Sequence, residues 1–242
     1  MTIPSQRIVA VVIGRSGSRG LPEKNILPIA GQPMIAHSIG HALNARHIDA
    51  TYCSTNGQHI AAAAKAAGAE VVMRPEHLAS DHATVDSAVR HVIDSSHDQA
   101  DIIVILYGNI PVRPPDLIDL AVEHMLSSEA DSVQSYAPVG KHHPFWTVQL
   151  DADDHVHQWE ENTVYRRQDL PEAYIPDGGV IVVRRSSLFN VDEKNPHAFL
   201  GDKRSGIRTP RGSVVDVDDE IDFELARILL EEKAASKDVN NE

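Results

Sequence analysis

The stretch from Ile8 to Ile29, IVAVVIGRSGSRGLPEKNILPI, decides the fold. Its first six residues are apolar and mostly β-branched, which is typical of a parallel strand buried on both faces. A loop with three glycines and several basic residues follows at once. Glycine lets backbone N–H groups approach an anion closely, and arginine and lysine add charge that a phosphate accepts. The stretch predicts a triphosphate-binding loop at the carboxyl end of the first strand.

The glycine loop taken by itself also fits an ordinary strand-to-helix connection with basic residues on its surface. It does not end in the GK[ST] of a Walker loop. Gly14, Gly17 and Gly20 are spaced three apart, unlike the G-x-G-x-x-G of dinucleotide-binding proteins. Other parts of the chain have to decide between these interpretations.

Length and composition narrow the class of protein. The 242 residues are enough for one α/β domain, expected over 1–242. With 22 Lys+Arg against 35 Asp+Glu, the net charge of −13 argues against a nucleic-acid partner. The one cysteine, Cys53, is expected to be a buried reduced thiol. A short polar start and the lack of an apolar run of about 18 residues predict a cytoplasmic protein without signal peptide or membrane span.

Strand-like and helix-like segments alternate along the chain. This alternation predicts a three-layer α/β sandwich with a mostly parallel sheet, whose ligand site lies at the carboxyl ends of the strands. The interval 140–174 is rich in aromatic and charged residues and is expected to be a small β-rich excursion that contacts a second subunit. Strands are expected at 8–13, 50–54, 70–73, 101–106, 132–137, 146–150, 180–183 and 214–217, and helices at 33–45, 60–67, 84–93, 114–125 and 221–232.

A pair of aspartates near the end of the chain is a candidate metal site. Asp216 and Asp218 alternate with valines, so in a strand they project to the same face. Two adjacent carboxylates repel each other unless a cation lies between them, and hard oxygen ligands suit Mg²⁺ bridged to phosphates. Alternatively, Asp218 or Asp219 caps the final helix.

Five separated motifs, in order, resemble the CMP-sialic acid synthetase (acylneuraminate cytidylyltransferase) family. These are R-S-G-S-R-G-L-P-E-K-N-I at 15–26, R-P-E-H-L-A-S-D-H-A-T at 74–84, Y-G-N-I-P-V-R-P at 107–114, R-R-Q-D at 166–169 and V-D-V-D-D at 215–219. The resemblance covers roughly residues 7–230. It implies the nucleotide-diphospho-sugar transferase-like fold and a site for CTP.

Residue by residue, the resemblance implies a catalytic set and a nucleotide set. The catalytic residues are Arg15, Lys24, Asp216 and Asp218, of which the two aspartates hold Mg²⁺. Arg74 suits the cytosine because its donor fork reaches the O2 and N3 acceptors. Ser80 or Asp81 alternatively starts the following helix, and Asn56 alternatively belongs to a plain turn. The nucleotide set is Gly14, Arg15, Ser16, Gly17, Ser18, Arg19, Asn25, Asn56, Arg74 and Ser80.

The sugar site implied by the resemblance departs from the family within the motif at 107–114. Tyr107 stands where the family has a glutamine that contacts the sugar, and Asn109 stands for a threonine, whereas Arg113 matches. Arg166, Arg167 and Gln168 correspond to a segment that reaches the sugar, often from across the dimer. Neighbouring guanidinium groups bind a carboxylate well, although a solvated basic turn is the alternative.

The implied reaction is the transfer of CMP from CTP to the anomeric hydroxyl of a sialic-acid-like 2-keto-3-deoxy acid sugar, with release of pyrophosphate. The implied assembly is a homodimer. Two alternatives stay open. One is a cytidylyltransferase for another acid sugar, such as a legionaminic, Kdn- or Kdo-like substrate. The other is a catalytically silent nucleotide-binding paralogue.

Overall fold

The structure of the chain is a computed structural model that describes residues 6–17, 20–192 and 194–239. Its centre is a seven-stranded sheet in the order β11-β7-β10-β6-β1-β4-β5. Strand β10 runs antiparallel to both of its neighbours, and the other adjacent strands are parallel. The strands are β1 (Ile8–Ile13), β4 (Ala50–Thr55), β5 (Glu70–Met73), β6 (Ile102–Tyr107), β7 (Ser132–Pro138), β10 (Tyr174–Arg184) and β11 (Arg204–Arg208).

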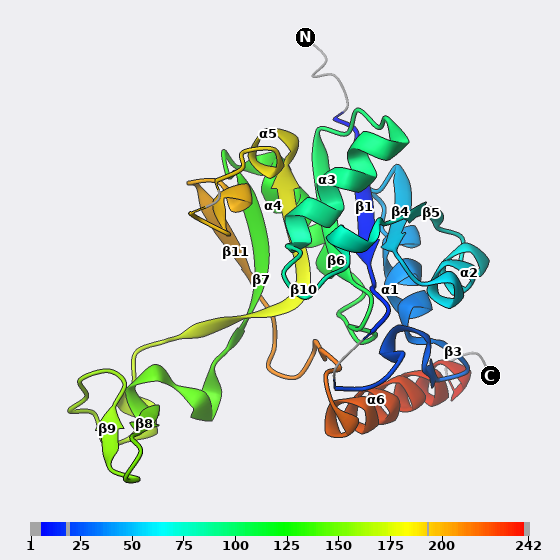
Figure 1. The fold of residues 1–242 in the computed structure, drawn as a ribbon. Helices are drawn as coiled ribbons and strands as arrows, with labels where there is room; N and C mark the ends of the chain where they lie inside the picture. Colours follow the sequence, from blue (N-terminus) through cyan, green and yellow to red (C-terminus); the bar gives the residue numbers. More distant parts are fainter. Residues whose placement is uncertain (1–5, 18–19, 193, 240–242) are drawn as a thin grey trace.

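Helices cover both faces of this sheet, which confirms the predicted three-layer sandwich (Figure 1). Alternate residues of β1 show why its sequence is apolar throughout. Ala10 and Val12 belong to the core with α1, α2 and α4, whereas Val9 and Val11 belong to the core with α3 and α5, and all four are fully buried. The helices are α1 (Met34–Leu43), α2 (Gln58–Ala66), α3 (Val85–Ser96), α4 (Leu117–Ser127) and α5 (Arg185–Leu188).

A third, smaller core lies under the long last helix, α6 (Glu220–Val239). Ala226 of α6 packs with Ile29 and Met34 and with Val215 and Val217. The short strands β2 (Pro28–Ile29) and β3 (Gln32–Pro33) form a two-stranded ladder beside it. This packing holds the segment around the two predicted metal ligands against the residues that follow the glycine loop.

The predicted excursion is an arm that extends from the main body between β7 and β10 (Figure 1). It carries an antiparallel hairpin of β8 (Val148–Leu150) and β9 (Val156–Gln158). Apolar side chains on the arm are exposed, among them Trp159 at 63% and Tyr165 at 93%.

Four sequence predictions need correction. The strand predicted at 214–217 is wrong, because this segment crosses the loop after β6 and, in the described part of the chain, makes one isolated bridge, between Val215 and Val112. The edge strand β11 was missed, since its sequence RSGIR alternates exposed and half-buried residues and has one large apolar side chain. Strand β9 was also missed, because all three of its residues are exposed, and β10 is much longer than 180–183. The other predicted elements lie within a few residues of those observed.

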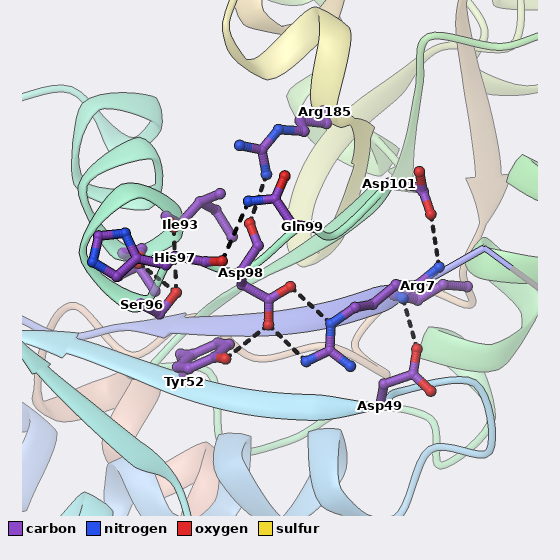
Figure 2. Close-up of polar contacts among 12 residues, drawn as sticks. Arg7, Asp49, Tyr52, Ile93, Ser96, His97, Asp98, Gln99, Asp101 and Arg185 are labelled. Atoms are coloured by element: carbon purple, nitrogen blue, oxygen red, sulfur yellow. Dashed lines mark hydrogen bonds and ion pairs between the residues drawn. The ribbon is translucent and has the colours of Figure 1, made fainter.

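The amino ends of the parallel strands are joined by a network of polar contacts (Figure 2). The guanidinium of Arg7 donates through Nε and Nη2 to the two carboxylate oxygens of Asp98, at 2.8 and 2.7 Å. The Tyr52 hydroxyl donates to the same carboxylate at 2.8 Å, and the Arg7 backbone N–H donates to Asp101 at 2.8 Å. These contacts fix the starts of β1, β4 and β6 relative to one another.

Within residues 6–17, 20–192 and 194–239, every helix is too short or too polar to span a lipid bilayer.

Candidate active site

A cleft of about 470 Å³ opens at the carboxyl ends of β1, β5 and β6. It brings together the glycine loop, the segment after β5, the loop after β6 and one of the two late aspartates. Its lining consists of Ile13, Gly14, Arg15, Gly20, Lys24, Asn25, Arg74, Ser80, Asp81, Ala83, Thr84, Val85, Tyr107, Asn109 and Asp218.

The basic loop and the acidic segment touch directly. Lys24 Nζ lies 2.6 Å from Asp218 Oδ1 and also donates to the carbonyl of Val217 at 3.2 Å. A Cβ on Gly20 would lie only 2.2 Å from the carbonyl oxygen of Asp218. Since real Cβ contacts are never this short, only glycine lets the loop come this close. Opposite charges from the two ends of the chain therefore face the same cleft.

Asp216 lies in an environment that disfavours its charge. Loss of hydration around the carboxyl and repulsion from Asp218 raise the pKa of Asp216 to about 6. The residue nevertheless keeps contact with solvent. Lys24 and Arg113 oppose this rise. Asn109 Nδ2 donates to Asp216 Oδ1 at 2.5 Å. A cation beside this pair of carboxylates would remove the repulsion between them.

The loop after β6 holds the acidic segment in place. The backbone N–H groups of Val215 and Val217 donate to the carbonyls of Val112 and Asn109, at 3.3 and 3.0 Å. Asn109 Nδ2 also donates to the carbonyl of Val217 at 3.2 Å. The two segments are about a hundred residues apart in sequence, so these contacts are entirely tertiary.

The segment after β5 supplies the other wall of the cleft. Arg15 Nη2 lies 2.7 Å from Asp81 Oδ1, and Arg15 Nη1 donates to the carbonyl of Ala79 at 3.2 Å. Arg74 is 9% exposed and donates to the carbonyls of Ser54 and Leu78, at 2.8 and 3.3 Å. Asp81 was not among the predicted site residues, because its place in the R-P-E-H-L-A-S-D run was interpreted only as a helix start.

Several residues predicted to bind the nucleotide hydrogen-bond instead to the backbone of the glycine loop. Asn25 is 3% exposed and donates through Nδ2 to the carbonyl of Arg15 at 3.0 Å. A Cβ on Gly108 would lie 2.8 Å from Asn25 Oδ1, so this asparagine needs a glycine beside it. Asn56 Oδ1 accepts the backbone N–H of Ser16 at 3.0 Å. Asn56, Ser16 and Gly17 are absent from the cleft lining, and Ser18 and Arg19 lie outside the described residues.

Comparison with known proteins agrees with this arrangement. A family profile described as cytidylyltransferase matches residues 9–198. The chain belongs to the cytidylyltransferase family.

Named relatives of this cytidylyltransferase-family chain act on acid sugars. It is 30% identical over 217 residues to an N-acylneuraminate cytidylyltransferase from Streptococcus agalactiae serotype III, covering 89% of this chain and 51% of that protein. It is 30% identical over 236 residues to a CMP-N,N'-diacetyllegionaminic acid synthase from Legionella pneumophila, covering 93% of this chain and 97% of that protein. The chain thus spans about half the length of the streptococcal relative and nearly all of the other.

Among solved structures, a CMP-2-keto-3-deoxy-manno-octonic acid synthetase complexed with CTP aligns with a TM-score of 0.74. The sequence identity is 20%, over 94% of this chain and 99% of the other. This likeness concerns the fold.

Arg113, for which a contact with the sugar is predicted, lies behind the cleft of the cytidylyltransferase site. Arg113 is 2% exposed and does not line the cleft. Its guanidinium donates to the carbonyls of Gly179 at 2.7 Å, Tyr107 at 3.0 Å and Ile110, and to Ser38 Oγ at 2.9 Å. The reason is a cluster of buried carbonyls that the chain brings together only when folded.

The remaining predicted sugar residues divide into two groups. Tyr107 and Asn109 line the cleft, and burial together with the nearby Asp216 raises the pKa of the Tyr107 hydroxyl. Arg166, Arg167 and Gln168 lie on the arm, and none of them lines the cleft of its own chain. Arg166 Nε lies 2.7 Å from Asp169 Oδ2 on the exposed surface.

The acidic pair has the donor chemistry for Mg²⁺. In the described part of the chain, one group of three His, Cys, Asp or Glu side chains could converge on an ion, namely Asp151, Asp153 and His155 at the turn between β8 and β9. The acidic pair therefore offers two carboxylates, of which Asp218 lines the cleft, while Asp81, the other carboxylate of the lining, pairs with Arg15. That set fits Mg²⁺, which usually takes one or two carboxylates and fills its other positions with substrate phosphates and water.

Proposed function

We propose that this chain transfers CMP from CTP to the anomeric hydroxyl of an acid sugar of the sialic acid type and releases pyrophosphate. The observation that carries the proposal is the shared cleft, where Lys24 of the glycine loop meets Asp218 of the acidic segment at 2.6 Å. A nucleoside triphosphate needs cationic groups for its phosphates and oxygen ligands for its metal ion. Both kinds of group face this cleft.

The roles of the residues follow from where they lie. Arg15 and Lys24 bind the triphosphate, and their ion pairs with Asp81 and Asp218 give way to phosphate oxygens when CTP enters. Asp216 and Asp218 hold Mg²⁺, which when bound offsets the negative charge of the triphosphate. The protein otherwise contributes positioning, because phosphoryl-type transfer asks for little covalent chemistry.

The sugar's carboxylate is bound, in our proposal, by Arg166 and Arg167 of a second copy of the chain. Both arginines are exposed and neither lines its own cleft. They belong to the arm that extends from the main body between β7 and β10 (Figure 1). The exposed Trp159 and Tyr165 on the same arm provide apolar surface for a homodimer contact. Because Tyr107 replaces the family glutamine in the cleft, a legionaminic, Kdn- or Kdo-like sugar is the alternative substrate.

A pyrophosphate-release assay with CTP, Mg²⁺ and a panel of acid sugars tests the reaction. We expect turnover with at least one 2-keto-3-deoxy acid sugar and none with neutral sugars. CTP binding without turnover on any acid sugar would contradict the enzyme and leave a nucleotide-binding protein.

Mixing two inactive variants tests the dimer. Asp216→Asn disables the cleft and R166A/R167A disables the arm. In a 1:1 mixture, half of the dimers are mixed and each holds one intact site, so about a quarter of the wild-type activity should return. If the mixture stays inactive, the arm does not act across subunits.

A further inference from the structure

Arg113 is a buried cation without a buried counter-charge. All its hydrogen bonds given by the structure go to three backbone carbonyls and the Ser38 hydroxyl, and in the described part of the chain no carboxylate lies within ion-pair distance of it. Burying a guanidinium costs far more than burying an apolar side chain of similar volume. Burying Arg113 only to support the structure would therefore cost much free energy of folding, and this cost points to a functional reason for the arginine.

The acceptors of Arg113 belong to three different elements. Ser38 lies on α1, Gly179 lies on β10, and Tyr107 and Ile110 lie at either end of the loop after β6. The planar donor fork of arginine is suited to hold several carbonyls in a fixed arrangement. Arg113 therefore fixes the position of the 107–110 loop relative to the sheet and α1.

The same loop carries the contacts that hold Asp216. Asn109 accepts the Val217 N–H at 3.0 Å and donates through its side chain to Asp216 Oδ1 at 2.5 Å. A shift of the loop must therefore shift the carboxylate. Arg113 is thus linked to Asp216 by two consecutive sets of hydrogen bonds. The first joins Arg113 to the carbonyls of Tyr107 and Ile110, and the second joins Asn109, between them, to Asp216 and Val217.

The charge of Arg113 also acts on Asp216. Burial lowers the pKa of the guanidinium to about 9, and Asp216 and Asp177 counteract this, so it stays charged at neutral pH. The Asp177 carboxylate already accepts hydrogen bonds from Ser135 Oγ at 2.5 Å, from Thr209 Oγ1 and from the Gly179 N–H at 2.9 Å. Asp216 has fewer partners, so it gains more from the buried positive charge.

We propose that Arg113 is a positioning residue for cytidylyl transfer, which fixes the 107–110 loop so that Asn109 holds the Asp216 carboxylate in the orientation that binds the metal ion of the CTP complex. The loop-fixing step stands on the contacts alone. The metal step rests on the function proposed above.

Hydrogen–deuterium exchange tests the loop-fixing step without metal or substrate. The matched control is Arg184, which likewise donates to three backbone carbonyls, those of Ala130, Met125 and Ser128, at the opposite edge of the sheet. In Arg113→Lys, the amides of Val215 and Val217 should exchange at least about tenfold faster, with β1 amides as an internal reference. In Arg184→Lys they should change less than twofold. Equal effects of the two variants, or no effect of either, would overturn the proposal.

Binding of Mn²⁺ tests the metal step. The electron paramagnetic resonance signal of free Mn²⁺ is followed while the ion is titrated into the full chain with CTP at the concentration of the protein and no sugar. The same titration of CTP without protein gives the Mn²⁺ that the nucleotide holds by itself. Loss of a group that orients a metal ligand typically weakens metal binding by about 10- to 100-fold. We expect a loss in this range for Arg113→Lys and for Asn109→Ala, and wild-type affinity for Arg184→Lys. Because Arg113 acts through Asn109, the double variant should bind no more weakly than the weaker single variant.

Ser38→Ala keeps the proposal testable if Arg113→Lys does not fold. This change removes one acceptor of Arg113 and the hydroxyl's own hydrogen bonds to the carbonyls of Tyr107 and Ile110, and it leaves the arginine in place. A two- to fivefold loss of Mn²⁺ affinity is expected, and an unchanged affinity would count against the fixing of the 107–110 loop by Arg113 and its partners. If the wild-type complex with CTP binds no Mn²⁺, the proposed metal site fails together with the metal step. If the wild type binds Mn²⁺ and the Arg113 variants bind it equally well, only the role of Arg113 fails.

Discussion

Charged residues are used in opposite ways where the parallel strands of the central sheet begin (the amino edge) and where they end (the carboxyl edge). At the amino edge, Asp98 is almost fully buried and accepts three hydrogen bonds from Arg7 and Tyr52 (Figure 2). These bonds, those of Arg7 first, hold the pKa of Asp98 below its usual value. At the carboxyl edge, Asp216 lies close to Asp218 and Asn109, which line the cleft, and has its pKa raised to about 6. The amino edge stabilises its ionised carboxylate, whereas the carboxyl edge holds a carboxylate whose charge is disfavoured and would be stabilised by a bound cation.

This difference shows what each edge contributes. Charges satisfied within the fold add to stability and are unavailable to a ligand. Charges gathered around an open cleft oppose folding and are therefore available for binding. Substitutions at the two edges should therefore separate stability from activity.

Asp216→Asn should give the largest effect, on catalysis alone. The amide keeps the size of the side chain and can still accept the hydrogen bond from Asn109, but it loses the negative charge. We expect kcat to fall about a thousandfold, measured by pyrophosphate release. The melting temperature in EDTA should not fall; a clear decrease would show that Asp216 serves the fold as Asp98 does.

Asp98→Asn should have the opposite profile. It breaks a buried carboxylate's contact with Arg7, whose side chain is 44% exposed and recovers some hydration. We expect the free energy of unfolding to fall by about 2 kcal/mol, measured by urea denaturation. The kcat per folded molecule should stay within twofold of wild type. Tyr52→Phe, which removes one of the three bonds, is the matched milder change and should cost about 1 kcal/mol. A drop in kcat for either variant would mean that the two edges are coupled.

Gly20→Ala probes the contact between the basic loop and the acidic segment. The added methyl group would meet the carbonyl oxygen of Asp218 at 2.2 Å, so the loop has to move away from it. We expect kcat/KM for CTP to fall about tenfold, with little change in stability because Gly20 is exposed. Gly40→Ala is the control, since neither glycine has a positive φ and a Cβ on Gly40 meets nothing within 4 Å. An equal loss in the control would show that the contact with Asp218 is not the cause.

The pH dependence of stability should have opposite signs for the two aspartates. Asp216 has a raised pKa, so its contribution to stability is present below about pH 4 and is lost as the pH rises through 6. Asp98 has a lowered pKa, so its contribution is present above its unfolded value of 3.8 and is lost as the pH falls through the folded value.

Melting curves in EDTA from pH 4 to pH 8 measure this difference. Asp216→Asn should gain about 1 kcal/mol over wild type at pH 8, a value kept small by solvent screening, and nothing at pH 4. Asp98→Asn should lose a nearly constant amount from pH 8 to pH 5 and less only as the pH falls below about 4, to which the curves of this variant are extended. If both variants shift in the same direction with pH, the contrast between the two edges is wrong.

Much of the fold could be predicted because apolar runs report burial directly. The residues of β1 and β6 are apolar on both faces because both faces are covered by helices, and this pattern is visible without a structure. The elements that were missed or misassigned lack such a pattern. Strand β11 owes its place to hydrogen bonds with β7, and the segment 214–217 is apolar because α6 covers it, although no strand flanks it there.

The sequence by itself determined the family, the sandwich and the neighbourhood of the site, because strand ends and glycine loops are local features that follow from the order of residues. Only the tertiary structure decided what each charged group does. Arg113 looks like any arginine near a site until the fold surrounds it with carbonyls, and Asn109 meets Asp216 across more than a hundred residues of chain. A side chain's type is written in the sequence, whereas its partners, its hydration and therefore the free energy of its charge are set by segments that meet only in the folded state.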